Sequence, residues 1–149
     1  MSYDALADFR MDGHTVIITG GAQNIGAGIA KTLSGAGARV MIADLKGEQA
    51  AATAAEIAKE TCDVTDKAAI DAVVAETVKA FGGISTLVNN VGWGGRQPDP
   101  AAIPEEKFIA SYKLNTISAY QMSMACLPFL LKAENATITN SGSFSSAVP

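Results

Sequence analysis

Histidine and cysteine are scarce in this chain of 149 residues: His14 is the only histidine, and Cys62 and Cys126 are the only cysteines. A Ser-His-Asp triad or a cluster of zinc ligands therefore has almost no side chains to draw on, and no metal site is expected. The two cysteines lie far apart and in no ligand spacing. They indicate reduced, buried thiols in a cytoplasmic protein.

Long apolar runs and basic clusters are also lacking. No stretch approaches the length of a membrane-spanning helix, and the first residues lack the basic-then-apolar order of a secretory signal. The net charge of −4 and the pI of about 4.9 argue against a nucleic-acid or anionic-membrane surface. With 48% hydrophobic and 17% charged residues, the composition is typical of one globular domain with its own core.

The stretch Val16–Gly28, VIITGGAQNIGAG, contains the main functional signal. Its β-branched run predicts a buried strand, Gly20 and Gly21 end that strand, and a helix opens at about Ile25. Unpaired amides at a helix N-terminus favour anions, and glycines let a pyrophosphate approach the backbone. The alternative is a plain strand-to-helix turn that merely uses glycine.

A second buried strand is predicted over Arg39–Ala43, and Asp44 follows it directly. Asp44 comes 24 residues after Gly20, close to the spacing at which an acidic residue meets the ribose hydroxyls of a dinucleotide. A carboxylate there accepts a hydrogen bond from a free 2′-hydroxyl and repels a 2′-phosphate, so NAD is expected in preference to NADP. The alternative for Asp44 is an ordinary cap or loop carboxylate.

These motifs resemble the short-chain dehydrogenase/reductase family, whose first turn reads Thr-Gly-x-x-x-Gly-x-Gly. An asparagine stands here where the middle glycine usually does, and the corresponding residues are Thr19, Gly20, Asn24, Ile25 and Gly26. Asparagine tolerates the left-handed backbone region, so this departure is mild. The resemblance implies an α/β fold of the Rossmann type: a doubly wound parallel sheet in three αβα layers, incomplete, with its first five strands in the order 3-2-1-4-5.

The resemblance also implies cofactor-binding residues further along the chain. Asp63 and Val64 match an Asp-Val pair that lines the adenine site, although a plain cap is the alternative for Asp63. Residues 89–92 match Asn-Asn-Ala-Gly, with Val91 in place of alanine. In that motif the first asparagine ties neighbouring strands together through side-chain bonds to the backbone. The expected cofactor-binding residues are therefore Gly20, Asn24, Ile25, Gly26, Asp44, Asp63, Val64, Asn90 and Gly92.

Two catalytic residues follow from the same resemblance. Asn115 matches the asparagine of a Leu-Asn motif that kinks its helix and holds a water near the catalytic lysine; a solvated polar residue is the alternative. Aligning residues 138–140 with the fifth strand of the family makes Ser143 the catalytic serine, with Ser141 as the runner-up.

The proton-transfer pair of the family, Tyr-x-x-x-Lys, does not occur in these residues. The three tyrosines are followed four residues later by Ala7, Thr116 and Met124. The pair would fall just beyond Pro149, so residues 1–149 are expected to form an NAD(P)-binding Rossmann domain truncated before that segment.

The implied function is NAD-dependent hydride transfer between a nicotinamide and a carbonyl or secondary alcohol. A small-molecule alcohol or ketone is the implied substrate, and a homo-oligomer, dimer or tetramer, is the implied full-length assembly. The alternative is a nucleotide-binding fragment or pseudoenzyme without turnover.

Hydrophobic patterning predicts the remaining elements. Helices are expected over Glu48–Lys59, Ala68–Phe81 and Lys107–Lys132, and strands over Ile84–Val88 and Ala136–Asn140. Thr65 or Asp66 is expected to cap the second of these helices. Residues 93–104 are expected to form a loop in which Trp93 is a candidate for a substrate wall. The last strand is expected to be an exposed apolar edge.

Overall fold

The computed structural model describes residues 9–46, 57–94 and 103–143. Five strands form one sheet in the order β3-β2-β1-β4-β5, which confirms the order that the resemblance implied. Every neighbouring pair in this sheet is parallel. The strands are β1 (Thr15–Thr19), β2 (Arg39–Asp44), β3 (Ile57–Thr61), β4 (Thr86–Asn89) and β5 (Thr137–Asn140).

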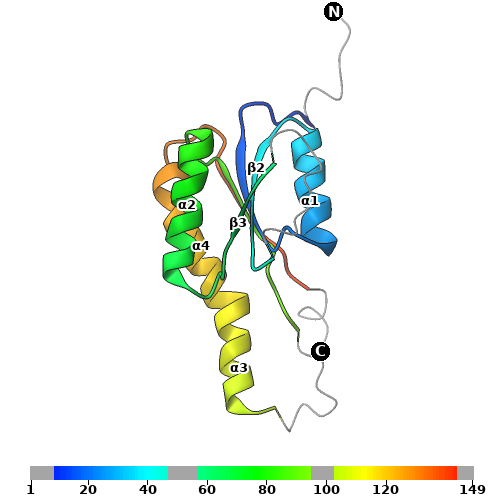
Figure 1. Ribbon diagram of the computed structural model, residues 1–149, viewed down its shortest axis with the longest axis vertical. Coiled ribbons are helices and arrows are strands. Elements are labelled where there is room, and N and C mark those ends of the chain that lie inside the picture. Colours follow the sequence, from blue (N-terminus) through cyan, green and yellow to red (C-terminus); the bar gives the residue numbers. More distant parts are fainter. Residues whose placement is uncertain (1–8, 47–56, 95–102, 144–149) are drawn as a thin grey trace, which may run out of the picture.

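Helices cover both faces of the sheet and give the three layers of a doubly wound fold (Figure 1). The helix α1 (Asn24–Gly35) covers one face, and α2 (Lys67–Phe81) and α4 (Ser118–Leu130) cover the other. The helix α3 (Glu105–Tyr112) leads into α4 through the π-helix η4 (Lys113–Ile117) and extends past the end of the sheet. The predicted fold class is thereby confirmed.

Strand side chains alternate between two cores. Ile17, Met41 and Leu87 face α2 and α4, where Ile70 and Met122 belong to the same buried cluster. The other face packs against α1 and is built by Val16, Ile18, Val40, Ile42 and Val88. Because the central strands are buried on both faces, each one appears in the sequence as a continuous apolar run.

The helix predicted over Glu48–Lys59 is wrong at its end, because residues 57–59 belong to β3. The remaining part of that prediction, residues 48–56, lies outside the described residues. Strand β3 pairs with β2, so that Ala58 lies beside Met41. Alanine, lysine and glutamate favour helices, and this pairing overrides their local preference.

The single helix predicted over Lys107–Lys132 is divided in the structure into α3, η4 and α4. The π-helix contains Asn115, the position at which the resemblance implies a kink. The helix cap is as predicted, because the Asp66 carboxylate accepts a hydrogen bond from the Ala68 N–H at 2.9 Å at the start of α2.

Both cysteines are free and buried, as predicted. Burial raises the pKa of the Cys62 thiol to about 11 and that of Cys126 to about 12. Neither thiol therefore forms a reactive thiolate at neutral pH. No described helix is long and apolar enough to cross a membrane.

The exposed edge strand β5 predicts that the chain associates with itself. All four of its residues are exposed, and Ile138 is 41% exposed. The outer edge of β5 has no strand partner among the described residues, and such an edge is a template for pairing, so a polypeptide of residues 1–149 should associate through β5. Ile138→Lys should lower its light scattering, because a lysine on the edge opposes such pairing. Phe9→Lys adds the same charge at a residue that is 76% exposed and outside the sheet. Equal effects of the two variants would contradict association through β5.

Candidate functional site

The turn between β1 and α1 requires backbone conformations that few residue types adopt. Gly20 has a φ of 67° and Asn24 a φ of 51°, both in the left-handed region that glycine and asparagine tolerate best. A Cβ atom at Gly26 would collide with the Gly20 carbonyl oxygen and lie 2.6 Å from Asn90 Nδ2. Only glycine at position 26 therefore lets α1 begin this close to the end of β1.

The N-terminus of α1 has no side-chain cap. Gln23 occupies the N-cap position without a side-chain hydrogen bond, and the first turn of α1 contains no acidic residue. By contrast, Asp66 caps α2, and Glu105 and Glu106 lie in the first turn of α3. The free donors and the positive end of the helix dipole make the start of α1 suited to an anion such as a pyrophosphate.

Asp44, at the end of β2, is oriented by two backbone amides. Its Oδ2 accepts the Ala22 N–H at 3.0 Å, and its Oδ1 accepts the Lys46 N–H at 2.9 Å. The first of these bonds joins the end of β2 to the glycine turn. The carboxylate remains partly exposed, so its remaining lone pairs can accept hydrogen bonds from hydroxyl groups.

Asp63 follows β3 and is held by the next turn of the chain. Its Oδ1 accepts hydrogen bonds from the Thr65 N–H and the Thr65 hydroxyl, both at 2.8 Å. These bonds lower the pKa of Asp63, and the nearby Lys113 ammonium lowers it further. Asp63 is therefore an ionised, exposed acceptor, and it is Asp66 that caps α2.

A cleft of about 330 Å³ lies at the carboxyl ends of the strands and gathers these features. The residues expected to bind a cofactor all line it: Gly20, Asn24, Ile25, Gly26, Asp44, Asp63, Val64, Asn90 and Gly92. Sequence reasoning did not assign the other lining residues, although each adjoins a residue that it singled out: Gln23, Leu45, Cys62, Val91 and Leu114.

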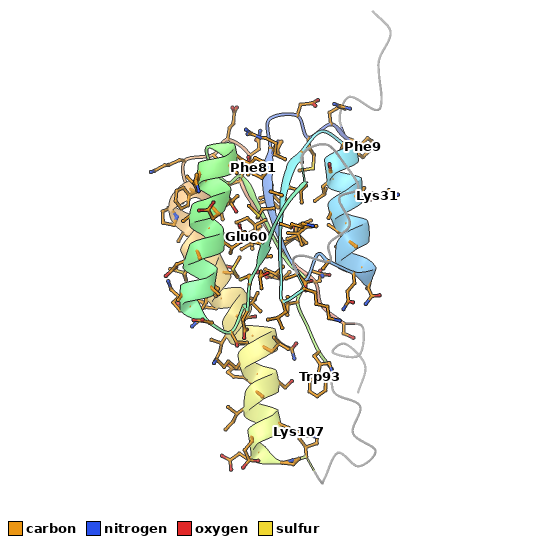
Figure 2. The ribbon with its side chains drawn as sticks, in the orientation of Figure 1. Phe9, Lys31, Glu60, Phe81, Trp93 and Lys107 are labelled. Carbon is orange, nitrogen blue, oxygen red and sulfur yellow. The ribbon has the colours of Figure 1, made fainter. Side chains whose placement is uncertain are left out.

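A larger hollow, of about 560 Å³, lies at the amino ends of the strands. Its wall includes Arg39, whose guanidinium lies 5.9 Å from the centre of the Phe81 ring. Phe81 and Trp93 lie toward opposite ends of the sheet (Figure 2). The helix α2 ends at Phe81, and the negative end of its dipole disfavours anions there. The smaller cleft is the better candidate site, because parallel sheets of this type bind ligands at the carboxyl ends of their strands.

The asparagines that end and follow β4, Asn89 and Asn90, have contacts that differ in part from those expected. It is Asn90 that ties strands together through the backbone, because its Nδ2 donates to the carbonyl oxygens of Thr19 and Gly20, both at 3.2 Å. The role expected for Asn89 is confirmed in part. Its Nδ2 donates to Asn140 Oδ1 at 2.9 Å and so ties β4 to the neighbouring strand β5, but through a side chain; its backbone acceptor, the Ala119 carbonyl at 3.4 Å, lies on α4.

The two expected catalytic residues lie outside the lining of the cleft. Asn115 holds the chain after β4: its Oδ1 accepts the Trp93 N–H at 2.8 Å, and its Nδ2 donates to the Trp93 carbonyl at 3.0 Å. Ser143 is exposed and follows β5, whose Asn140 lies beside Asn89 of β4. Both candidates therefore belong to the β4–β5 side of the carboxyl edge. Within the described ranges, no three His, Cys, Asp or Glu side chains are grouped to hold a metal ion.

Comparison with known proteins identifies the family. The family described as short chain dehydrogenase matches residues 14–149, and the chain belongs to it. Sorbitol dehydrogenase of Cereibacter sphaeroides is 51% identical over 85 residues, which are 54% of this chain and 33% of that protein. L-fucose dehydrogenase of Bos taurus is 32% identical over 132 residues, which are 87% of this chain and 49% of that protein.

A solved structure agrees with the fold. A 7α-hydroxysteroid dehydrogenase, complexed with NADH and 7-oxo glycochenodeoxycholic acid, superimposes with a TM-score of 0.90 and 28% identity. The match covers 99% of this chain and 60% of that one. The chain spans a third to a half of the length of the two curated relatives named above.

The contact at Gly26 can be tested by its effect on folding. Gly26→Ala should destabilise the protein by about 1–3 kcal/mol, since the new methyl group meets the backbone of Gly20. Gly28→Ala is the matched control in the same helix, where a Cβ has nothing within 4 Å. It should stabilise the protein by roughly 0.5–1 kcal/mol. Urea unfolding of both variants measures the difference, and equal stabilities would contradict the close approach of α1 to β1.

Proposed function

We propose that the protein containing this chain is an NAD-dependent oxidoreductase. It transfers a hydride between a nicotinamide and a carbonyl or secondary alcohol. The observation that carries the proposal is the cleft in which the uncapped start of α1, the turn at Gly20 and the oriented carboxylate of Asp44 meet. Membership of the short chain dehydrogenase family supports it, as does the NADH complex of the similar steroid dehydrogenase.

Each polar group of the cleft has a task in this proposal. The amides at the start of α1 hold the pyrophosphate, and glycine at position 26 lets α1 begin close enough to β1 for them to face the cleft. Asp44 accepts hydrogen bonds from the adenosine ribose, and Asp63 accepts one from the adenine amine. When bound, the nicotinamide supplies or receives the hydride.

The reacting groups lie on the other half of the carboxyl edge. The Ser143 hydroxyl donates a hydrogen bond to the substrate oxygen and so stabilises the charge that develops there. Asn115 keeps its helix and the chain after β4 in position, and it supports proton transfer to that oxygen.

The alternative is a nucleotide-binding protein without turnover. No tyrosine among the 149 residues is followed four residues later by lysine, which favours this alternative for the chain by itself. The intact mass of the protein purified from its source separates the two proposals. A mass near 15.3 kDa, with NADH binding but no oxidation of secondary alcohols, would favour the protein without turnover.

Cofactor preference follows from the carboxylate at the ribose site. The natural protein should bind NADH more tightly than NADPH, because Asp44 repels a 2′-phosphate. Asp44→Asn should shift the ratio of the two dissociation constants toward NADPH by about 10-fold, roughly 1.4 kcal/mol. Asp71→Asn removes the same charge on α2, away from the cleft, and should leave the ratio unchanged. Tighter binding of NADPH by the unmodified protein would refute the preference.

The serine assignment has its own test. Ser143→Ala should lower kcat by a factor on the order of 10²–10³, with little change in NADH affinity, because the hydroxyl acts on the substrate oxygen. Ser141→Ala is the control two residues earlier on the same segment. If Ser141→Ala lowers kcat and Ser143→Ala does not, Ser141 is the catalytic serine and the alignment is displaced.

A further inference from the structure

Trp93 is the only tryptophan of the 149 residues, and it lies directly after Asn90, Val91 and Gly92, which follow β4 and line the cleft. Its side chain is 54% exposed, although tryptophan is mostly buried in folded proteins. It lies near α3, at the end of the molecule where the strands terminate (Figure 2). A large aromatic ring in this position presents apolar surface at the edge of the candidate site.

The backbone of Trp93 is fixed while its ring is exposed. The single carboxamide of Asn115 pairs with both polar backbone groups of Trp93, at 2.8 Å and 3.0 Å. The same carboxamide also donates to Ser111 Oγ at 3.0 Å, so the contact is anchored on the end of α3. A side chain whose backbone is already ordered loses less entropy when a ligand packs on it.

Sheet order decides which part of a bound ligand Trp93 can meet. Asp44 ends β2 and Asp63 follows β3, on one side of β1. Trp93 and Ser143 follow β4 and β5, on the other side. A dinucleotide with its ribose at Asp44 and its pyrophosphate at the start of α1 therefore extends toward the β4–β5 side. The Trp93 ring then lies on the side where the substrate reacts.

We propose that the indole of Trp93 forms an apolar wall of the substrate site and packs against the hydrocarbon skeleton of the alcohol or ketone. The wall favours cyclic or aryl skeletons over short chains, because they bury more apolar surface against the ring. This inference rests on the proposed function, since it concerns the substrate of the same site.

The fluorescence of Trp93 makes the proposal measurable, because the emission of this residue is obtained as the difference between the natural protein and its Trp93→Phe variant. The natural protein is first saturated with NADH, and binding is followed through the emission of the nucleotide itself. Cyclohexanol or 1-phenylethanol is then added, which forms a complex that cannot react. Both alcohols should move the Trp93 emission to shorter wavelength, because they displace water from the ring, and 2-propanol should move it less.

Two variants of Trp93 and one control distinguish a substrate-contacting wall from a purely structural role of this side chain. Trp93→Ala should lower kcat/KM for the cyclic and aryl alcohols by about 10-fold more than for 2-propanol. Trp93→Phe should retain most of the preference, because it keeps an aromatic face. Phe9→Ala removes another exposed ring, away from the cleft, and should change neither value.

The outcomes distinguish this inference from the proposed function. If NADH binds but no alcohol moves the emission, or if Trp93→Ala lowers kcat/KM equally for all alcohols, the wall is wrong and the proposed function stands. If NADH does not bind, the proposed function fails and the wall fails with it.

Discussion

The close approach of α1 to the end of β1 is the constraint on which the candidate site depends. It requires glycine at position 26 and left-handed backbone at Gly20 and Asn24. Such backbone costs free energy unless the surroundings hold it. Here the Asn90 amide bonds to the Gly20 carbonyl, and Asp44 bonds to the Ala22 N–H. The ends of three strands are thereby fixed around one turn, and the amides of α1 are left facing the cleft.

The carboxyl edge of the sheet divides into two halves with different physical character. On the β2–β3 side, Asp44 and Asp63 each accept two hydrogen bonds from neighbouring groups, so their carboxylates are oriented before any ligand arrives. On the β4–β5 side, Trp93 and Ile138 expose apolar surface within the described part of the chain. In our proposal, nucleotide recognition therefore belongs to the first half. Contact with the substrate belongs to the other half, beside Trp93 and Ser143.

The glycine turn and Asp44 could be predicted from the sequence because their signals are local, whereas the strand order, Asp63, Val64, Asn90 and Gly92 followed from the resemblance to the family. A β-branched run, a glycine turn and an aspartate at the end of the next strand each leave a pattern that needs no distant partner. The predictions that were wrong or confirmed only in part concern features that depend on tertiary contacts. Ala58 joins a strand because β2 lies beside it, and the roles of Asn89 and Asn90 depend on which neighbour each side chain faces. A sequence of two adjacent asparagines contains no such information.

The position of Ser143 depends on polar pairing more than on core packing. All residues of β5 are exposed, so hydrophobic patterning does little to fix the register of this strand. The register is held at its end by the Asn89–Asn140 side-chain bond and by the Ser141 N–H, which donates to the Asn89 carbonyl at 2.8 Å. A slip by one residue would reverse every side chain of β5 and carry Ser143 away from the edge. Asn89 is thus buried beside β5 to set the register of that strand, even though its Oδ1 has no partner among the described residues.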